Sequence, residues 1–161
     1  MKLTSHEEYG LRCLLRLGQQ GSSGSLTIPQ ISEAEGVSEA YVAKLLRMLR
    51  RGGFVKAARG NVGGYSLSRP AGQIILSDVM NALGQPLFDA VFCEAHSGQL
   101  ARCVREVDCS LRVLWQDLQA AIDQVLRKTT LEDLFRDEKQ MVAWMEGVRH
   151  FGTSQRQNTR Q

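Results

Sequence analysis

The chain has 161 residues, 43% of them hydrophobic, and a formal net charge of +3. This length allows one domain with a proper core plus an appendage, and it excludes two independent large domains. No apolar run is long enough to span a bilayer, and the charged, amphipathic start of the chain is not a signal peptide. We therefore expect a cytoplasmic protein that has no membrane partner.

The first predicted element is an amphipathic helix over residues 5–17. Thr4 and Glu7 have the spacing of a capping box, and Gly18 follows the last turn as an exit signal. Leucines dominate one face of this helix, and Cys13 lies among them. That position favours a small core residue over a reactive thiol.

The centre of the chain predicts a helix-turn-helix. A helix that begins near Thr27 is followed by Gly36, which can adopt positive φ, and by Ser38, which can cap a second helix. At about 100° per residue, the second helix has an apolar stripe on one side and small or basic residues on the other. The second helix of this motif lies in the DNA major groove, so we expect double-stranded DNA as the partner. The apolar stripe consists of Val42, Leu45, Leu46 and Leu49.

Positive charge is concentrated in the same part of the chain. Between Glu39 and Asp78 there are seven basic and no acidic residues, so this window carries +7 and the remainder is net acidic. Such a block is typical of a phosphate-binding surface, although a solvated basic face is the plainer alternative. We expect base contacts near the start of the second helix and phosphate contacts beyond them. The predicted base contacts are Ser38, Ala40, Tyr41 and Lys44, and the predicted phosphate contacts are Arg47, Arg50, Arg51 and Arg59.

Two short strand-like runs, 54–58 and 65–68, flank a glycine-rich tip and predict a β-hairpin. A hairpin after a recognition helix is a wing, with Arg59 at its base. Glycine-rich loops also bind nucleotide phosphates, but that reading needs a helix directly after Gly64, and the sequence predicts none there. The predicted fold is therefore mainly α with a small β wing, a winged helix-turn-helix.

A long helix is predicted over residues 110–128, because apolar residues recur there at spacings of four and three. A small winged domain offers little surface for five helical turns, so we expect a homodimer that binds a palindromic operator. Packing of this helix against its own domain is the alternative. The expected parts are the winged domain (1–86), a cysteine loop (87–109), the dimerisation helix region (110–135), and a C-terminal helix with a disordered tail (136–161).

Three of the four cysteines, Cys93, Cys103 and Cys109, fall within seventeen residues that lack apolar rhythm. Without an export signal, a disulfide framework is not expected. Clustered thiolates suit an iron-sulfur cluster or zinc. The intervals of nine and then five residues match neither zinc ribbons nor ferredoxins, and three cysteines are one ligand short of a tetrathiolate site.

The chain resembles a known family over most of its length. The matching segments are MKLTSHEEYGLRCLLRL (1–17), ISEAEGVSEAYVAKLLRMLRRGGFV (31–55), the wing RGNVGGYSLSRP (59–70), and LWQDLQAAIDQVLRKTTLEDL (114–134) after three cysteines. They are similar to the IscR-type winged-helix transcription regulators, a bacterial group that includes iron-sulfur and nitric-oxide sensors. The resemblance implies a dimeric regulator, acting as a repressor, whose DNA binding depends on an iron-sulfur cluster in the cysteine loop. We expect 2Fe-2S, with 4Fe-4S as the second option.

The resemblance also implies a ligand set. It assigns thiolate ligation to Cys93, Cys103 and Cys109, although the first interval is longer here than in the family. The iron-sulfur assembly branch has a histidine three residues after the third cysteine, where this chain has Arg112, which cannot bind a metal. The nitric-oxide-sensing branch takes a carboxylate from helix 1, at the position of Glu8. We therefore predict Glu8, donated by the partner subunit, as the fourth ligand.

Several alternatives stay open at this point. Glu94 and His96, inside the loop, compete for the fourth ligand position, and Glu8 is also explained as a surface residue favoured by the helix dipole. The three cysteines can instead form a metal-free thiol switch or a zinc site in a DNA-binding regulator. A third reading is an iron-sulfur enzyme or carrier, but no catalytic constellation is recognisable, so we expect no enzyme.

Overall fold

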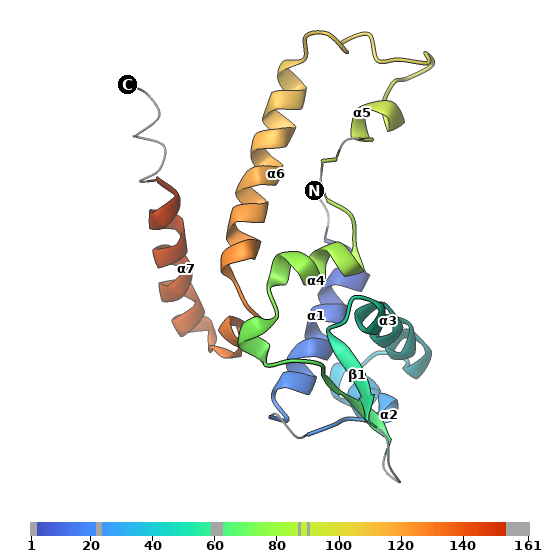
Figure 1. The fold of residues 1–161 in the computed structure, drawn as a ribbon, viewed down its shortest axis with the longest axis vertical. Coiled ribbons are helices and arrows are strands. Elements are labelled where there is room, and N and C mark those ends of the chain that lie inside the picture. Colours follow the sequence, from blue (N-terminus) through green and yellow to red (C-terminus); the bar gives the residue numbers. More distant parts are fainter. Residues whose placement is uncertain (1–2, 22–23, 59–62, 87, 90, 154–161) are drawn as a thin grey trace.

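The computed structural model describes residues 3–21, 24–58, 63–86, 88–89 and 91–153. A winged domain lies at one end, and α6 rises from it toward the cysteine loop, with α7 alongside (Figure 1). None of the helices within these ranges combines the length and the hydropathy needed to cross a bilayer. The elements in order are α1 (Ser5–Gly18), α2 (Ile28–Glu35), α3 (Glu39–Arg51), β1 (Val55–Ala58), β2 (Gly64–Leu67), η1 (Ala71–Gln73), α4 (Leu76–Leu83), α5 (Phe92–Ala95), α6 (Ser110–Lys128), η2 (Glu132–Phe135) and α7 (Glu138–Thr153).

Local capping signals fix where α1 and α2 begin. The Thr4 backbone N–H donates to Glu7 Oε2 at 2.6 Å, and the Glu7 N–H donates to Thr4 Oγ1 at 3.4 Å. This is the predicted capping box. Thr27 and Gln30 form a second one at the start of α2. Each box satisfies backbone N–H groups that a helix start leaves without partners.

The turn between α2 and α3 has the predicted geometry. Gly36 caps α2 with φ of 66°, a left-handed conformation that glycine adopts without steric cost. Ser38 then accepts the Tyr41 backbone N–H at 3.4 Å and starts α3. The helix-turn-helix is therefore specified locally on both sides of the turn.

The core of the winged domain forms around the apolar stripe of α3. All four residues of that stripe are fully buried, against α1, α2 and α4. Cys13 is fully buried in the same core, and desolvation raises the pKa of its thiol to about 12. The interpretation of Cys13 as a core residue is therefore confirmed.

The wing is a two-stranded antiparallel hairpin, as predicted, with Val55 opposite Leu67. An isolated bridge between Leu26 and Tyr65 adds the chain before α2 to its outer edge. Residues 59–62, between the two strands, lie outside the described residues, and they include the predicted phosphate contact Arg59. The mainly helical fold with a small β wing is confirmed.

The C-terminal end of α6 is joined to the winged domain by backbone hydrogen bonds. The Leu76 N–H donates to the Thr129 carbonyl at 2.9 Å, and the Leu131 N–H donates to the Ile74 carbonyl at 2.8 Å. Leu131 is fully buried and completes the core. In contrast, α6, described along its whole length, has no buried residue.

Two differences from the sequence prediction concern short or terminal segments. The short helix α5 interrupts a segment in which no apolar rhythm was found, because four residues are too few to show periodicity. Helix α7 extends to Thr153 and so includes the first two residues of the expected disordered tail. The rest of that tail lies outside the described residues.

Candidate nucleic-acid interface and candidate metal centre

The exposed side of α3 carries the predicted DNA contacts that the structure describes. Opposite the buried stripe, this surface is small near the helix start and basic further along. Small residues let a helix approach base edges closely, and guanidinium and ammonium groups neutralise phosphates. The exposed members of the set are Ser38, Ala40, Lys44, Arg47, Arg50 and Arg51.

Tyr41 differs from the other predicted base contacts because its side chain is only half exposed. Its ring packs edge-on against Tyr9 with 6.0 Å between centroids, and the His6 ring lies 5.7 Å away. Both neighbours belong to α1. The position of the Tyr41 ring on α3 is therefore fixed by the first helix.

One residue of the basic block has a structural role that the sequence did not reveal. Arg69 donates from Nη1 to the Gly53 carbonyl at 3.2 Å and from Nε to the Gln73 carbonyl at 3.1 Å. Its guanidinium also lies over the Phe54 ring, 5.1 Å from the centroid. Arg69 therefore fastens the end of the wing to the domain, and its charge contributes less to a phosphate-binding surface than the sequence suggested.

An ion cluster around one buried carboxylate joins α1 to the end of α2. Arg12 Nε lies 2.7 Å from Glu35 Oε2, and Arg16 Nε lies 2.8 Å from Glu35 Oε1. The Glu35 side chain is only 6% exposed, so its charge needs both partners. Glu35 directly precedes Gly36, and the cluster therefore holds the turn of the helix-turn-helix against α1. No local sequence pattern indicates this ion cluster, because its partners are far apart along the chain.

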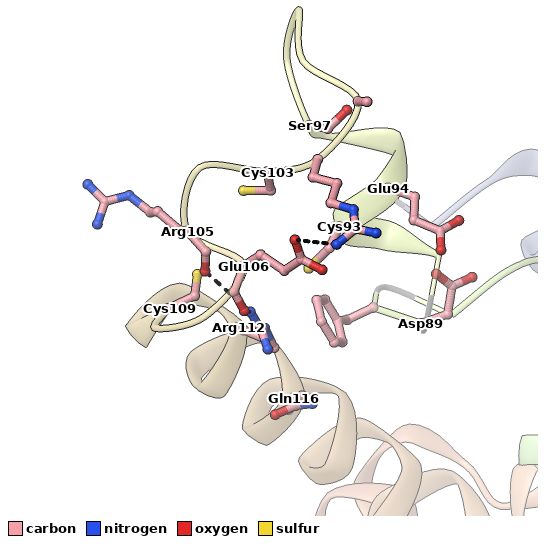
Figure 2. Close-up of a pocket in the computed structure, with 13 residues that line it drawn as sticks. Asp89, Cys93, Glu94, Ser97, Cys103, Arg105, Glu106, Cys109, Arg112 and Gln116 are labelled. Carbon is pink, nitrogen blue, oxygen red and sulfur yellow. Dashed lines mark hydrogen bonds and ion pairs between the residues drawn. The ribbon is translucent and has the colours of Figure 1, made fainter.

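The three clustered cysteines line one cavity of about 680 Å³ (Figure 2). Cys93 comes from α5, Cys103 from the loop that follows, and Cys109 occupies the N-cap position of α6. All three are half-buried free thiols. The clustering in sequence is therefore also a clustering in space, at the end of α6 farthest from the winged domain.

The thiols share a cavity without forming a finished ligand set. Among the residues that the structure describes, no three His, Cys, Asp or Glu side chains lie close enough together to hold a metal ion. Coordination by all three cysteines requires this exposed loop to contract. Its other members have few packing contacts to lose, since Val104 and Val107 are 82% and 100% exposed.

The three candidates for the fourth ligand lie in different surroundings. Glu94 lines the same cavity as the cysteines. His96 has Nδ1 2.8 Å from the Phe92 carbonyl oxygen, and its ring stacks on Phe92 with 4.1 Å between centroids. Glu8 is exposed in the first turn of α1. Which of them binds a metal stays a prediction.

Arg112 reaches from the first turn of α6 into the cysteine cavity. Its Nη2 donates to the carbonyl oxygens of Arg105, at 3.3 Å, and of Glu106. Within the described part of the chain, Arg112 Nε is the one buried side-chain nitrogen or oxygen without a hydrogen-bond partner. Three thiols beside an unused cationic donor suit an anionic, sulfur-rich group, so these residues fit an iron-sulfur cluster.

Gln119 holds the other end of the loop to α6. The Phe88 backbone N–H donates to Gln119 Oε1 at 3.2 Å, and Gln119 Nε2 donates to Asp123 Oδ1 at 2.7 Å. Arg112 and Gln119, two turns apart on α6, therefore hold the segment after Cys103 and the segment before Cys93. Sequence reasoning missed both contacts, because each joins residues that no local pattern links.

Comparisons with known proteins agree with this architecture. The model of the Rrf2 family, described as an iron-dependent transcriptional regulator, matches residues 3–137. The chain is 35% identical over 137 residues to protein rrf2 of Nitratidesulfovibrio vulgaris, covering 85% of this chain and 89% of that protein. It is 32% identical over 139 residues to the HTH-type transcriptional regulator IscR of Xenorhabdus nematophila, covering 86% and 82%. The structure of CymR, the global cysteine regulator of B. subtilis, superposes with a TM-score of 0.69 at 28% identity, covering 85% of this chain and 99% of that one.

Proposed function

The chain belongs to the Rrf2 family of transcriptional regulators, and from this premise we propose that it is a dimeric, sequence-specific DNA-binding repressor whose DNA affinity depends on an iron-sulfur cluster. Its relatives are regulators and not enzymes, as we expected for this chain. The observation that carries the sensor part is the single cavity lined by Cys93, Cys103 and Cys109.

The DNA-binding part rests on the surface of α3. Lys44 and Arg47 lie on its exposed face, and the core stripe on the opposite face holds the helix in place. A phosphate backbone is bound by such charges through counterion release, which makes the affinity strongly salt-dependent. Arg59, outside the described residues, remains a proposed contact of the wing.

The dimer rests on the apolar face of α6. Leu111, Leu114 and Leu118 are between 41% and 51% exposed in the single chain. Three large apolar side chains in a row on one helix are typical of an interface. A two-fold dimer through this face presents two copies of α3 to a palindromic operator, whose half-sites lie about 34 Å apart or at multiples of that distance.

The sensor rests on the position of the cysteine loop between α4 and α6. A bound iron-sulfur cluster supplies a centre that reacts to electrons, oxygen or nitric oxide. Residues 93–109 carry the thiols, and a change in how these thiols are held changes the path of the chain into α6. The spacing of the two recognition helices then changes, and DNA affinity changes with it.

A metal-free thiol switch is the second candidate. The same three half-buried, free thiols favour it, because thiols that share one cavity can form a disulfide after a small loop movement. A zinc site would need the same contraction. Both leave the DNA-binding part of the proposal unchanged, and both predict a colourless protein.

The test is an ultraviolet-visible spectrum of protein purified without oxygen, with iron and acid-labile sulfide assayed on the same sample. We expect visible absorption with matched iron and sulfide, and operator binding that changes when the cluster is removed. A protein that stays colourless after anaerobic reconstitution would exclude the cluster sensor. Separate Glu8→Ala, Glu94→Gln and His96→Ala variants then identify the fourth ligand as the one whose loss changes the spectrum.

A further inference from the structure

The cysteine cavity contains a positive charge that no ligand role explains. The Arg112 side chain extends from α6 beneath the loop, and its bonds to the carbonyls of Arg105 and Glu106 are drawn in Figure 2. Its Nε is buried without a hydrogen-bond partner, and Arg112 is one of the residues that line the cavity. A buried N–H of a charged group without an acceptor is costly, so this donor needs a partner that the protein alone does not supply.

The cavity also limits what that partner can be. The carbonyl oxygens nearest to the guanidinium are already bound through Nη2. Besides the three thiols, the cavity is lined by acceptors from Asp89, Glu94, Ser97, Gln116 and Glu106. None of them accepts from Arg112 Nε, and the Glu106 carboxylate faces Arg102 with 3.9 Å between the charged atoms. A group that brings the three thiols together in this cavity can supply the missing acceptor, because sulfur atoms accept such hydrogen bonds in iron-sulfur sites.

We propose that Arg112 is a positioning residue of the cysteine site that holds the loop before Cys109 with Nη2 and donates its Nε–H to a sulfur of the bound cluster. This inference rests on the proposed cluster sensor and adds a residue that cannot itself be a ligand. The planar guanidinium suits the role, because it presents several donors in fixed directions and keeps its charge at any pH a protein encounters.

Two consequences follow from this placement. A fixed positive charge and a hydrogen bond to sulfur stabilise the reduced cluster, which carries the additional negative charge, so they raise its reduction potential. Hydrogen bonds to the carbonyls of residues 105 and 106 also limit the movement of the chain between Cys103 and Cys109, which slows the loss of iron. The first consequence depends on charge and hydrogen bonding, the second on hydrogen bonding alone.

Three variants separate these contributions. Arg112→Gln removes both the charge and the forked donor. Arg112→Lys keeps the charge but cannot reach two carbonyls and a sulfur in the same geometry. Arg102→Gln is the matched control, since Arg102 lines the same cavity but its side chain is 82% exposed and its charge is screened by water.

The experiment uses full-length protein reconstituted anaerobically with iron and sulfide. It measures the reduction potential by dye-coupled titration and the rate of iron release to a chelator, with thermal melting to confirm that each variant is folded. We expect Arg112→Gln to lower the potential and to release iron about 10- to 100-fold faster. Arg112→Lys keeps the charge and should lower the potential less than Arg112→Gln, but it should also release iron faster than the wild type. Arg102→Gln should match the wild type in both quantities.

The outcomes distinguish this inference from the proposed function. A folded wild-type protein that takes up no cluster would overturn both. A wild type that loads, together with an Arg112→Gln variant of unchanged potential and iron release, would overturn the role of Arg112 alone. So would an Arg102→Gln variant that shifts both quantities as much as Arg112→Gln. Failure of folded Arg112→Gln to load while Arg102→Gln loads would support the inference.

Discussion

Helices α3 and α6 have the same kind of sequence pattern, but their apolar stripes differ in how far they are buried within this chain. Each has an apolar stripe at helical spacing, but the α3 stripe is fully buried, whereas Leu111, Leu114 and Leu118 of α6 are 41–51% exposed. The winged domain contains its own core, and the upper part of α6 lies beside an open loop. An apolar stripe on a helix therefore indicates that this side of the helix is buried by something. Whether the same domain buries it depends on how many neighbouring elements pack on the helix, and this differs between α3 and α6.

The cysteines of the winged domain and of the loop before α6 also differ in burial. Cys13 is fully buried in the core of the winged domain, and burial raises the pKa of its thiol to about 12. Cys93, Cys103 and Cys109 are half-exposed in the loop before α6. One chain therefore contains an inert thiol and three accessible ones, and the difference comes from packing.

Thiol labelling gives the largest expected contrast. In the metal-free, reduced protein at pH 8, we expect three thiols to react with an alkylating reagent and Cys13 to react at least about a thousandfold more slowly, because it is exposed only when the domain opens. Mass spectrometry of the labelled peptides measures each rate. A Cys13 rate within tenfold of the loop thiols would show that the two regions open together.

A matched pair of substitutions tests the comparison of the two stripes. Leu46→Ala should lower the free energy of unfolding by about 2–5 kcal/mol, the usual cost of a cavity in a core. Leu118→Ala should lower it by less than about 1 kcal/mol in the monomer and should instead weaken dimerisation. Urea unfolding and sedimentation give the two quantities. If Leu118→Ala leaves the oligomeric state unchanged at all concentrations, α6 is not the dimer interface.

Substitutions of exposed basic residues compare the polar surfaces of the two helices. Arg47→Ala on α3 should weaken operator binding about tenfold and reduce the slope of log affinity against log salt by about one, because one phosphate contact is lost. Lys128→Ala at the end of α6 is the control and should leave both values unchanged. Equal effects of the two variants would place the DNA elsewhere than on α3.

The smallest expected effect concerns Asp133, in the segment that follows α6 and joins it to the winged domain. Burial opposes ionisation of Asp133, but the backbone N–H and hydroxyl of Thr130, each at 2.8 Å, and the Arg136 guanidinium lower its pKa below the usual value. Asp133 therefore stabilises the folded state above an unfolded pKa of about 3.9, and this contribution is lost as the pH falls through the lower folded pKa. Between pH 6 and pH 3, Asp133→Asn should lose less stability than the wild type. Equal losses in urea unfolding would exclude this role.

The features that the sequence predicted are those with local signals. Capping at Thr4, left-handed Gly36 and the start and end of α6 are each determined within a few residues, so composition and spacing revealed them. The clustering of the cysteines in the sequence indicated that they share one loop, and the structure shows that they also line one cavity. The ion cluster at Glu35 was not predicted, because it depends on how distant segments pack. The contact of Arg112 with residues six and seven positions away was also not predicted, because it depends on the path of an irregular loop that no periodicity indicates.

The way in which α6 is attached has a mechanical consequence. Its 19 residues form a helix about 28 Å long. The chain directly after its C-terminal end is held by the hydrogen bonds between Leu76 and Thr129 and between Ile74 and Leu131. The cysteine loop joins α6 at its other end, where Cys109 is the N-cap residue. With the fixed end as pivot, a displacement of about 5 Å at the free end is a rotation of only about 10°. The stiffness of this attachment, which includes the packing of α4 on α6, therefore determines how much of any loop movement reaches the winged domain.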